Sequence, residues 1–198
     1  MSQNIKVKVA AVQAAPVYMN LDASVEKACK FINEAAEQGA KLVAFPQAFL
    51  PGYPWWIWID NPIAGIMNDK LLFENALTVP GPAIQKLSQC ARENDIYVCI
   101  SGTEREGNSM YLTQFWFDNE GNLIGKHRKM KPTLIERTIW GEGDGSMMQV
   151  FDTPIGKLGG LESREHLNPM NMIALAAQGE QIHVASWPAL SDETETLM

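Results

Sequence analysis

Three polar side chains lie at or just beyond the ends of strand-like segments of this sequence, and they are the first candidates for chemistry. Gln47 follows Phe45-Pro46, Lys129 follows His127-Arg128, and Ser163 follows Gly160-Leu161. Because strands of one sheet end at common edges, where α/β proteins bind ligands, we expect these positions to converge on one crevice. Taken singly, each has an ordinary explanation, since a lone lysine is usually a solvated charge and a lone serine a turn residue.

Ser163 lies in the most informative stretch, Gly159 to Pro169. An apolar segment, Ile155 to Leu161, precedes it, and a helical pattern begins at Asn168-Pro169. Asn is a good helix N-cap, and Pro fits the first helical position. The chain is therefore predicted to turn sharply from a strand into a helix at Ser163. Many hydrolases present their nucleophile on such an elbow, because the turn lifts one side chain clear of the sheet.

The rest of the chain alternates strands with helices. Apolar or alternating runs predict strands at residues 5–13, 41–46, 96–101, 110–117, 122–129, 148–151, 158–161 and 182–185, and helical spacing predicts helices at about 21–36, 63–76, 84–96 and 169–178. The first helix can be capped by Asn20 or Asp22 and ended by Gly39. This order predicts parallel pairing and an α/β class, with a mixed sheet covered by helices on one face. The other face needs a partner layer, which favours a four-layer α-β-β-α sandwich.

The segment 47–62 is unlike a core element. It contains Pro51-Gly52-Tyr53-Pro54 and then Trp55, Trp56 and Trp58. One interpretation is a loop whose aromatic rings fill the edge of the core. The other is an aromatic pocket wall or a subunit contact. The sequence leaves both open.

Composition excludes several classes of function. The 198 residues suffice for one domain, and 46% hydrophobic with 20% charged residues is ordinary for a globular protein. A net charge of −7 argues against a nucleic-acid partner. No apolar run is long enough to span a membrane, and the polar segment Met1 to Lys6 lacks the layout of a signal peptide. The three cysteines, Cys29, Cys90 and Cys99, have no metal-ligand spacing, so we expect buried thiols, a reducing, cytoplasmic location and no metal or other cofactor.

Considered together, the segments around Gln47, Lys129 and Ser163 resemble the signatures of the nitrilase superfamily of carbon–nitrogen hydrolases, and most closely its nitrilase branch. The segments are Phe45 to Pro54, His127 to Thr133 and Gly159 to His166, supported by Glu136 to Gly145 and His183 to Pro188. The resemblance implies a nitrilase-like α-β-β-α sandwich, with residues 1–198 as a single, partial carbon–nitrogen hydrolase domain. The fold is expected to be incomplete at its C-terminal end, because family members continue well past the Trp187-Pro188 segment.

The resemblance also implies a reaction. In this family a cysteine thiol attacks a nitrile carbon to form a covalent thioimidate, a glutamate acts as general base, and a lysine stabilises developing negative charge. Ammonia leaves, and water releases a carboxylic acid. Lys129 matches the lysine and Glu136 matches a second glutamate of the family site. Substrate contacts are expected from four further residues, Tyr53, Arg164, His166 and Trp187.

Two positions depart from that pattern. Gln47 stands where the general base belongs, and Ser163 stands where the nucleophile belongs. A glutamine amide cannot take up a proton at neutral pH, and a serine nucleophile depends on an adjacent base. Loss of a general base alone is worth about 10² to 10⁴ in rate. Arg164 also replaces the aromatic residue that usually follows the nucleophile, and this charge would be costly if it were buried without a partner.

We therefore expect a nitrilase-family protein that is inactive or severely impaired. Glu162 and Glu165 are the available substitutes for the base, and neither is expected to reach the nucleophile. The alternative is a non-catalytic role, in which the chain binds a nitrile or amide without turnover or serves as a regulatory subunit. A working serine hydrolase ranks last. The resemblance implies a small-molecule partner, a homo-oligomer, and no nucleic-acid or membrane partner.

Overall fold

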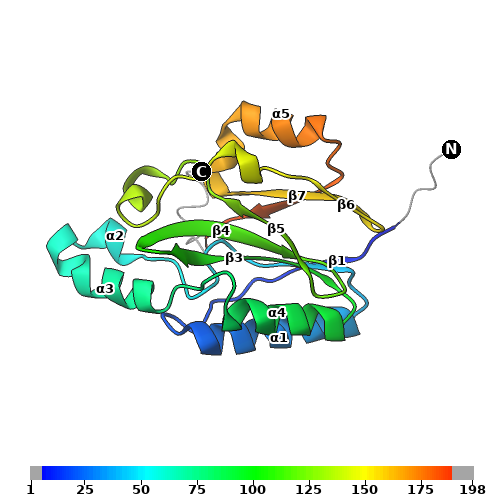
Figure 1. The fold of residues 1–198 in the computed structure, drawn as a ribbon, viewed down its shortest axis with the longest axis horizontal. Coiled ribbons are helices and arrows are strands. Elements are labelled where there is room, and N and C mark those ends of the chain that lie inside the picture. Colours follow the sequence, from blue (N-terminus) through cyan, green and yellow to red (C-terminus); the bar gives the residue numbers. More distant parts are fainter. Residues whose placement is uncertain (1–5, 189–198) are drawn as a thin grey trace.

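Two β-sheets stacked face to face, each covered by helices on its outer side, form a four-layer α-β-β-α arrangement (Figure 1). The computed structural model describes residues 6–188. Helices α1 (Leu21–Glu37) and α4 (Pro82–Glu93) lie side by side on the larger sheet, and α5 (Pro169–Ala177) lies on the outer side of the smaller sheet. The fold class predicted from the sequence is confirmed.

The larger sheet has five strands in sequence order. They are β1 (Val9–Ala11), β2 (Leu42–Ala44), β3 (Tyr97–Glu106), β4 (Ser109–Phe117) and β5 (Leu123–Arg128). The first three strands pair in parallel, and β4 and β5 continue the sheet with antiparallel pairing. The crossover helix α1 begins as predicted, because the Asn20 side chain accepts a hydrogen bond from the Ala23 amide at 3.0 Å.

The smaller sheet contains β6 (Phe151–Thr153), β7 (Gly156–Glu162) and β8 (Ile182–Ser186). Strands β6 and β7 form an antiparallel hairpin, whereas β7 and β8 are parallel and are connected through α5. The predicted strands therefore divide between two sheets. Strand spacing along a sequence does not specify this division, because a strand can pair with any neighbour whose register suits it.

The core follows the two-residue period of the strands. Val98 and Ile100 of β3 pack with the buried faces of α1 and α4. Cys99 and Trp116 point the other way and pack with the smaller sheet. At Gly160 the sheets come so close that a Cβ atom would lie 2.7 Å from Gln114 Oε1 and 3.0 Å from the Trp116 ring, both on β4 of the larger sheet. Glycine at this position therefore permits the close stacking of the sheets behind the elbow.

The aromatic segment after Gln47 is partly helical. It contains the short helix α2 (Trp56–Ile59) and leads into α3 (Pro62–Glu74). Trp56 is buried in a cluster with Tyr53 and Trp140. The core-filling interpretation therefore applies to Trp56, whereas Trp55 and Trp58 remain 38% and 46% exposed. Three short 3₁₀ helices complete the described elements: η1 (Leu134–Thr138), η2 (Gly145–Met147) and η3 (Ser163–Leu167).

The prediction of three buried thiols is wrong for two cysteines. Cys29 and Cys90 form a disulfide between α1 and α4, with Cα atoms 5.8 Å apart, and Cys99 is a buried free thiol. Their 61-residue separation hid the pairing, which arises because both cysteines face the contact between the two helices. The expectation of a reducing, cytoplasmic location loses this support. Within residues 6–188, no helix combines the length and the apolar character needed to cross a bilayer.

Candidate active site

The elbow at the end of β7 has the geometry that the sequence predicted. Ser163 follows the last residue of β7 and opens η3, and its φ of +39° lies in the left-handed region. A non-glycine residue in that region stores backbone strain, which is typical of functional turns. The Ser163 side chain is buried, and Asn168 caps α5 by accepting a hydrogen bond from the Met170 amide at 3.1 Å.

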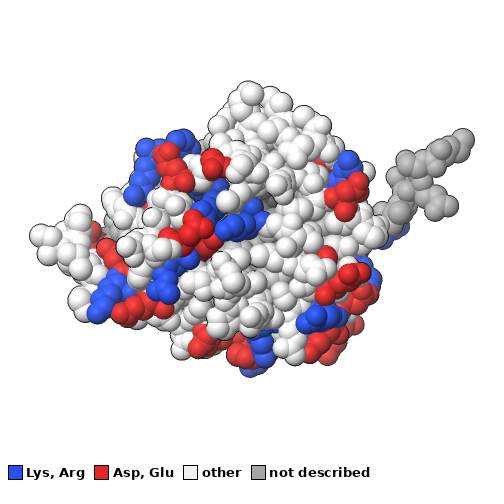
Figure 2. Space-filling view, in the orientation of Figure 1, with Lys and Arg blue, Asp and Glu red and all other residues white. Residues whose placement is uncertain are grey.

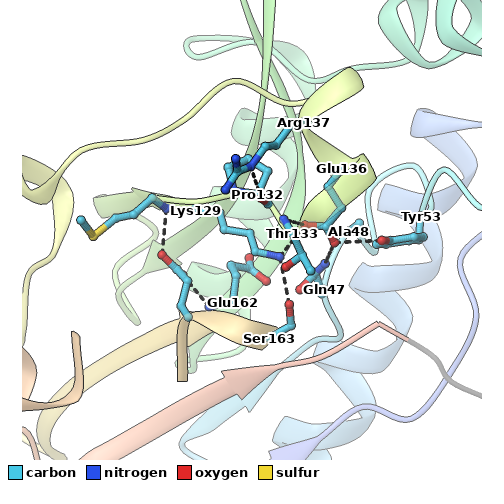
Figure 3. Close-up of polar contacts among 12 residues, drawn as sticks. Gln47, Ala48, Tyr53, Lys129, Pro132, Thr133, Glu136, Arg137, Glu162 and Ser163 are labelled. Atoms are coloured by element: carbon cyan, nitrogen blue, oxygen red, sulfur yellow. Dashed lines mark hydrogen bonds and ion pairs between the residues drawn. The ribbon is translucent and has the colours of Figure 1, made fainter. Parts of the chain in front are cut away.

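Four side chains from separate parts of the chain meet at this elbow (Figure 3). Lys129, fully buried beyond the end of β5, donates from Nζ to Glu136 Oε2 at 2.7 Å and to Ser163 Oγ at 2.9 Å. Gln47, beyond the end of β2, approaches Glu136 Oε1 through Nε2 at 3.4 Å. The three strand ends therefore converge as expected, and Glu136 of η1 connects them.

Glu136 is fixed by further donors. The Tyr53 hydroxyl donates to Glu136 Oε1 at 2.8 Å, and the Thr133 amide donates to Oε2 at 2.6 Å. Trp58 in turn donates from Nε1 to the Tyr53 hydroxyl at 3.0 Å. Burial, followed by the negative charge of Glu136, raises the pKa of Tyr53 well above its usual range, so this hydroxyl remains a donor. The sequence did not predict these roles of Thr133 and Trp58. Thr133 contacts Glu136 through its backbone, and Trp58 acts on Glu136 only through Tyr53, which is distant from it in sequence.

Glu165 and Glu162, the two acidic residues beside the elbow, differ in their contacts and in the direction of their pKa shifts. Glu165 accepts hydrogen bonds from the backbone amides of Met130 and Glu162, both at 2.8 Å, and pairs with His127 at 2.9 Å. Burial opposes its ionisation, but these contacts outweigh burial and lower the pKa of Glu165. Glu162 is fully buried at the end of β7. Burial raises its pKa to about 8, although the Ser101 hydroxyl and the charge of Lys129 oppose the rise.

A cavity of about 390 Å³ opens above Ser163 and Glu136. This volume lies in the range of small-molecule sites. Its apolar wall is formed by three tryptophans, Trp55, Trp58 and Trp187, and Tyr53 also lines it. Of the sequence-predicted substrate contacts, Tyr53, Arg164 and Trp187 therefore face the cavity. Lys129 and Gln47 do not line it, but both contact Glu136, which does.

Arg164 and His166, both expected to contact substrate, lie in different surroundings. Arg164 lines the cavity but is exposed, so the expected cost of a buried, unpartnered charge does not arise. His166 is half-buried, does not line the cavity, and stacks its ring on Trp187 with centroids 5.7 Å apart. On a short 3₁₀ helix, adjacent residues point in different directions, which the sequence alone could not resolve.

Comparison with known proteins agrees with the site geometry. Residues 8–196 match the sequence profile of the family described as carbon-nitrogen hydrolase. The chain belongs to the carbon-nitrogen hydrolase family. It is 55% identical over 188 residues to a nitrilase of Bacillus sp. (strain OxB-1), covering 95% of this chain and 55% of that protein. It is 45% identical to an aliphatic nitrilase of Rhodococcus rhodochrous, covering 93% of this chain and 50% of the relative.

Solved structures of the superfamily share the fold. An amidase from Nesterenkonia sp. AN1, solved as a double mutant in complex with acrylamide, superimposes with a TM-score of 0.76 at 20% identity. The match covers 99% of this chain and 70% of that one. The chain spans about half the length of the curated relatives that it matches, at 55% and 50% of the two nitrilases.

Proposed function

We propose that this carbon-nitrogen hydrolase family chain binds small nitriles or amides in the cavity above Ser163 but does not hydrolyse them at nitrilase rates. Membership of the family and the nitrilase names of its relatives support the ligand class. One observation carries the loss of turnover: in the described part of the chain, the hydrogen-bond partner of Ser163 Oγ is Lys129 Nζ, at 2.9 Å. An ammonium group is a donor without a lone pair, so it cannot take the hydroxyl proton.

No neighbouring group in the described residues is arranged to replace the missing base. Gln47 offers an amide, which does not accept a proton at neutral pH. Glu162 retains its proton in most molecules at pH 7, because its pKa is about 8. Glu165 is held by His127 and by two backbone amides. The family reaction requires a nucleophile that loses a proton as it attacks, and among residues 6–188 that proton has no acceptor within hydrogen-bond reach.

The cavity wall suggests the kind of ligand. The wall presents the aromatic surface of Trp55, Trp58 and Trp187, and polar groups of the lining come from Ser163 and Glu136. Such a site suits a ligand with an apolar substituent and one small polar end, which describes an organic nitrile or amide. Arg164 adds a positive charge at the exposed side of the cavity.

The decisive experiment restores the family residues. Ammonia release from a nitrile panel is measured for the unmodified chain and for the triple variant Gln47→Glu, Ser163→Cys, Arg164→Trp. We expect no release from the unmodified chain, but a rise in its melting temperature with one or more nitriles or amides. Turnover by the unmodified chain at nitrilase-like rates would contradict the proposal, and so would the lack of any thermal shift in a folded sample. Adding Lys129→Met to the triple variant is the matched control and is expected to abolish any restored activity.

A covalent probe separates the nucleophile from the base. The Nesterenkonia amidase, with a glutamate changed to glutamine, has been solved with acrylamide added at its active site cysteine. By analogy, Ser163→Cys alone is expected to gain one acrylamide by mass spectrometry under native conditions. The unmodified chain is expected to gain none, because its free thiol, Cys99, is fully buried. Equal labelling of both proteins would show that the elbow does not expose its side chain to ligands.

A second candidate role, as a non-catalytic subunit of an oligomer, is favoured by one surface. The outer side of α5 and the turn before it expose Leu167, Met170 and Ile173 at 61%, 65% and 56%. Figure 2 shows no charged residue over α5 on the face that it presents. Exposed apolar patches of this kind often mark protein contacts. We expect a homo-oligomer, and a Met170→Glu/Ile173→Glu variant should lower its mass in light scattering; a monomer before substitution would remove this support.

A further inference from the structure

A line of hydrogen bonds runs from the back of the elbow away from the cavity. The backbone carbonyl of Ser163 contacts His166 Nδ1 at 2.5 Å. His166 Nε2 contacts His183 Nε2 at 2.8 Å, and His183 Nδ1 contacts Glu180 Oε1 at 2.8 Å. The line therefore connects the strained residue of η3 to β8 through two imidazole rings. It takes no part in the contacts among Lys129, Glu136 and Ser163.

The two ends of this line fix the positions of the ring protons. A carbonyl oxygen accepts hydrogen bonds but cannot donate one, so His166 Nδ1 must carry a proton. An ionised Glu180 is likewise an acceptor, so His183 Nδ1 must also carry one. A neutral imidazole with its proton on Nδ1 has a lone pair on Nε2. Two neutral rings would therefore direct lone pairs at each other across 2.8 Å. The contact becomes favourable when a single proton lies between the two Nε2 atoms.

The surroundings suit one extra positive charge. The Glu180 side chain is only 9% exposed, and its carboxylate lies over Gly159, where a Cβ atom would come within 2.2 Å of Oε1. Glycine at position 159 thus makes room for the counterion of the pair. Within residues 6–188 there is no group of three or more candidate ligands that could hold a metal ion. A proton is therefore a simpler bridge than a metal.

We propose that His166 and His183 share one proton, and that this charged pair, with Glu180 as its counterion, positions the Ser163 elbow and the Trp187 wall of the cavity. His166 holds the carbonyl of the strained residue, and its ring stacks on Trp187. The Trp187 carbonyl in turn accepts a hydrogen bond from the backbone N–H of Gln47 at 3.0 Å. One cationic pair thus braces both sides of the site. His166 and His183 are positioning residues, and this role holds whether or not the chain turns a nitrile over.

The charges around the pair agree with one shared proton rather than two. Burial lowers the pKa of His166, and a charge on His183 lowers it further, so a second proton enters with difficulty. Glu165 on the same 3₁₀ helix and Glu180 before β8 act in the opposite direction and favour the first proton. Unfolded histidines titrate near pH 6.5 and would take up two protons in acid. The stability contributed by the pair should therefore be greatest near neutral pH and fall on both sides.

Nitrogen-15 NMR of the full chain in EDTA tests the bridge directly. We expect both Nδ1 atoms to be protonated and one strongly deshielded proton to couple to both Nε2 atoms. An unprotonated Nδ1 on either ring near neutral pH would overturn the proposal. If no shared proton is found in EDTA and adding Zn²⁺ shifts both Nε2 resonances, a metal is the bridge and the proposal is overturned.

Substitutions at position 183 test the role of the proton. His183→Leu removes the bridge, and we expect a lower melting temperature with no basic limb in its pH profile. His183→Gln can still donate a hydrogen bond to a neutral His166, so it should recover much of the melting temperature but none of the pH dependence. Equal losses of melting temperature in both variants at every pH would show that the two histidines contribute only packing, which would contradict the proposal. If His183→Leu does not fold, the NMR measurement on the unmodified chain still decides.

Discussion

At the scale of single residues, Glu162 shows how burial can convert a carboxylate into a neutral acid. Its pKa of about 8 in the folded chain compares with an ordinary value of 4.5. Between these two pH values the folded chain keeps a proton that the unfolded chain releases. Stability therefore falls as the pH rises through this window, and the full loss is present above pH 8. The sign is opposite to that of a carboxylate in a salt bridge.

Replacing this acid by its neutral isostere should remove the loss. Glu162→Gln is expected to raise the melting temperature by roughly 5–10 °C at about pH 8.5 and by much less near pH 5, since a few kcal/mol are at stake. Thermal unfolding followed by circular dichroism across this range measures the difference. Glu37→Gln, at an exposed position on α1, is the matched control and should change little at either pH. A gain that is the same at both pH values would show that Glu162 is ionised in the folded chain.

Removing one charge from the Lys129–Glu136 pair should have the opposite effect and lower the stability of the chain. Both side chains are buried, and their charged atoms are 2.7 Å apart. Lys129→Met leaves the Glu136 carboxylate without its cation and should cost about 3–5 kcal/mol in chemical denaturation. The double variant Lys129→Met/Glu136→Gln should recover part of this, because no unpaired buried charge remains. Additive losses in the double-mutant cycle would mean that the two charges are not coupled.

At the scale of elements, the elbow and the sheet behind it were largely readable from the sequence. A strand, a turn and a helix were predicted from Asn168-Pro169 and the apolar segment before Ser163, and all three are present. The division of strands into two sheets was not readable, because it depends on packing between distant segments. The same limit hid the exposure of Arg164 and the contact of His166 with His183 and Glu180, since these depend on side-chain direction within one turn of η3.

Close stacking of the two sheets gives a prediction at this scale. Gly160→Ala would place a Cβ atom 2.6 Å from the Val184 carbonyl oxygen and 2.7 Å from Gln114 Oε1. The added methyl group must then push β7 away from β8 and from the larger sheet, at an expected cost of about 1–3 kcal/mol. Urea unfolding measures the loss. Gly145→Ala, where a Cβ atom meets nothing within 4 Å, is the matched control. A loss no larger than that of the control would show that β8 moves freely.

At the scale of the whole molecule, the outer helical layer is joined covalently. The disulfide between Cys29 and Cys90 closes a loop across 61 positions and holds α1 against α4. These helices cover the sheet whose strand ends carry Gln47 and Lys129, so the linkage supports the site from a distance. Sequence reasoning overlooked it because an odd number of cysteines, with no metal-ligand spacing, is also typical of free thiols.

The disulfide predicts the number of reactive thiols in each state of the chain. Folded protein should give none with Ellman's reagent, because Cys99 is fully buried. Denatured protein should give one without reductant and three after reduction. Replacing Cys29 and Cys90 together by alanine should lower the free energy of unfolding by about 4 kcal/mol, the chain-entropy value for a loop of this length. Cys99→Ala is the control that removes the free thiol and leaves the linkage intact. Three thiols in denatured, unreduced protein would mean that the chain carries no disulfide, and the expectation of a reducing compartment would then regain its support.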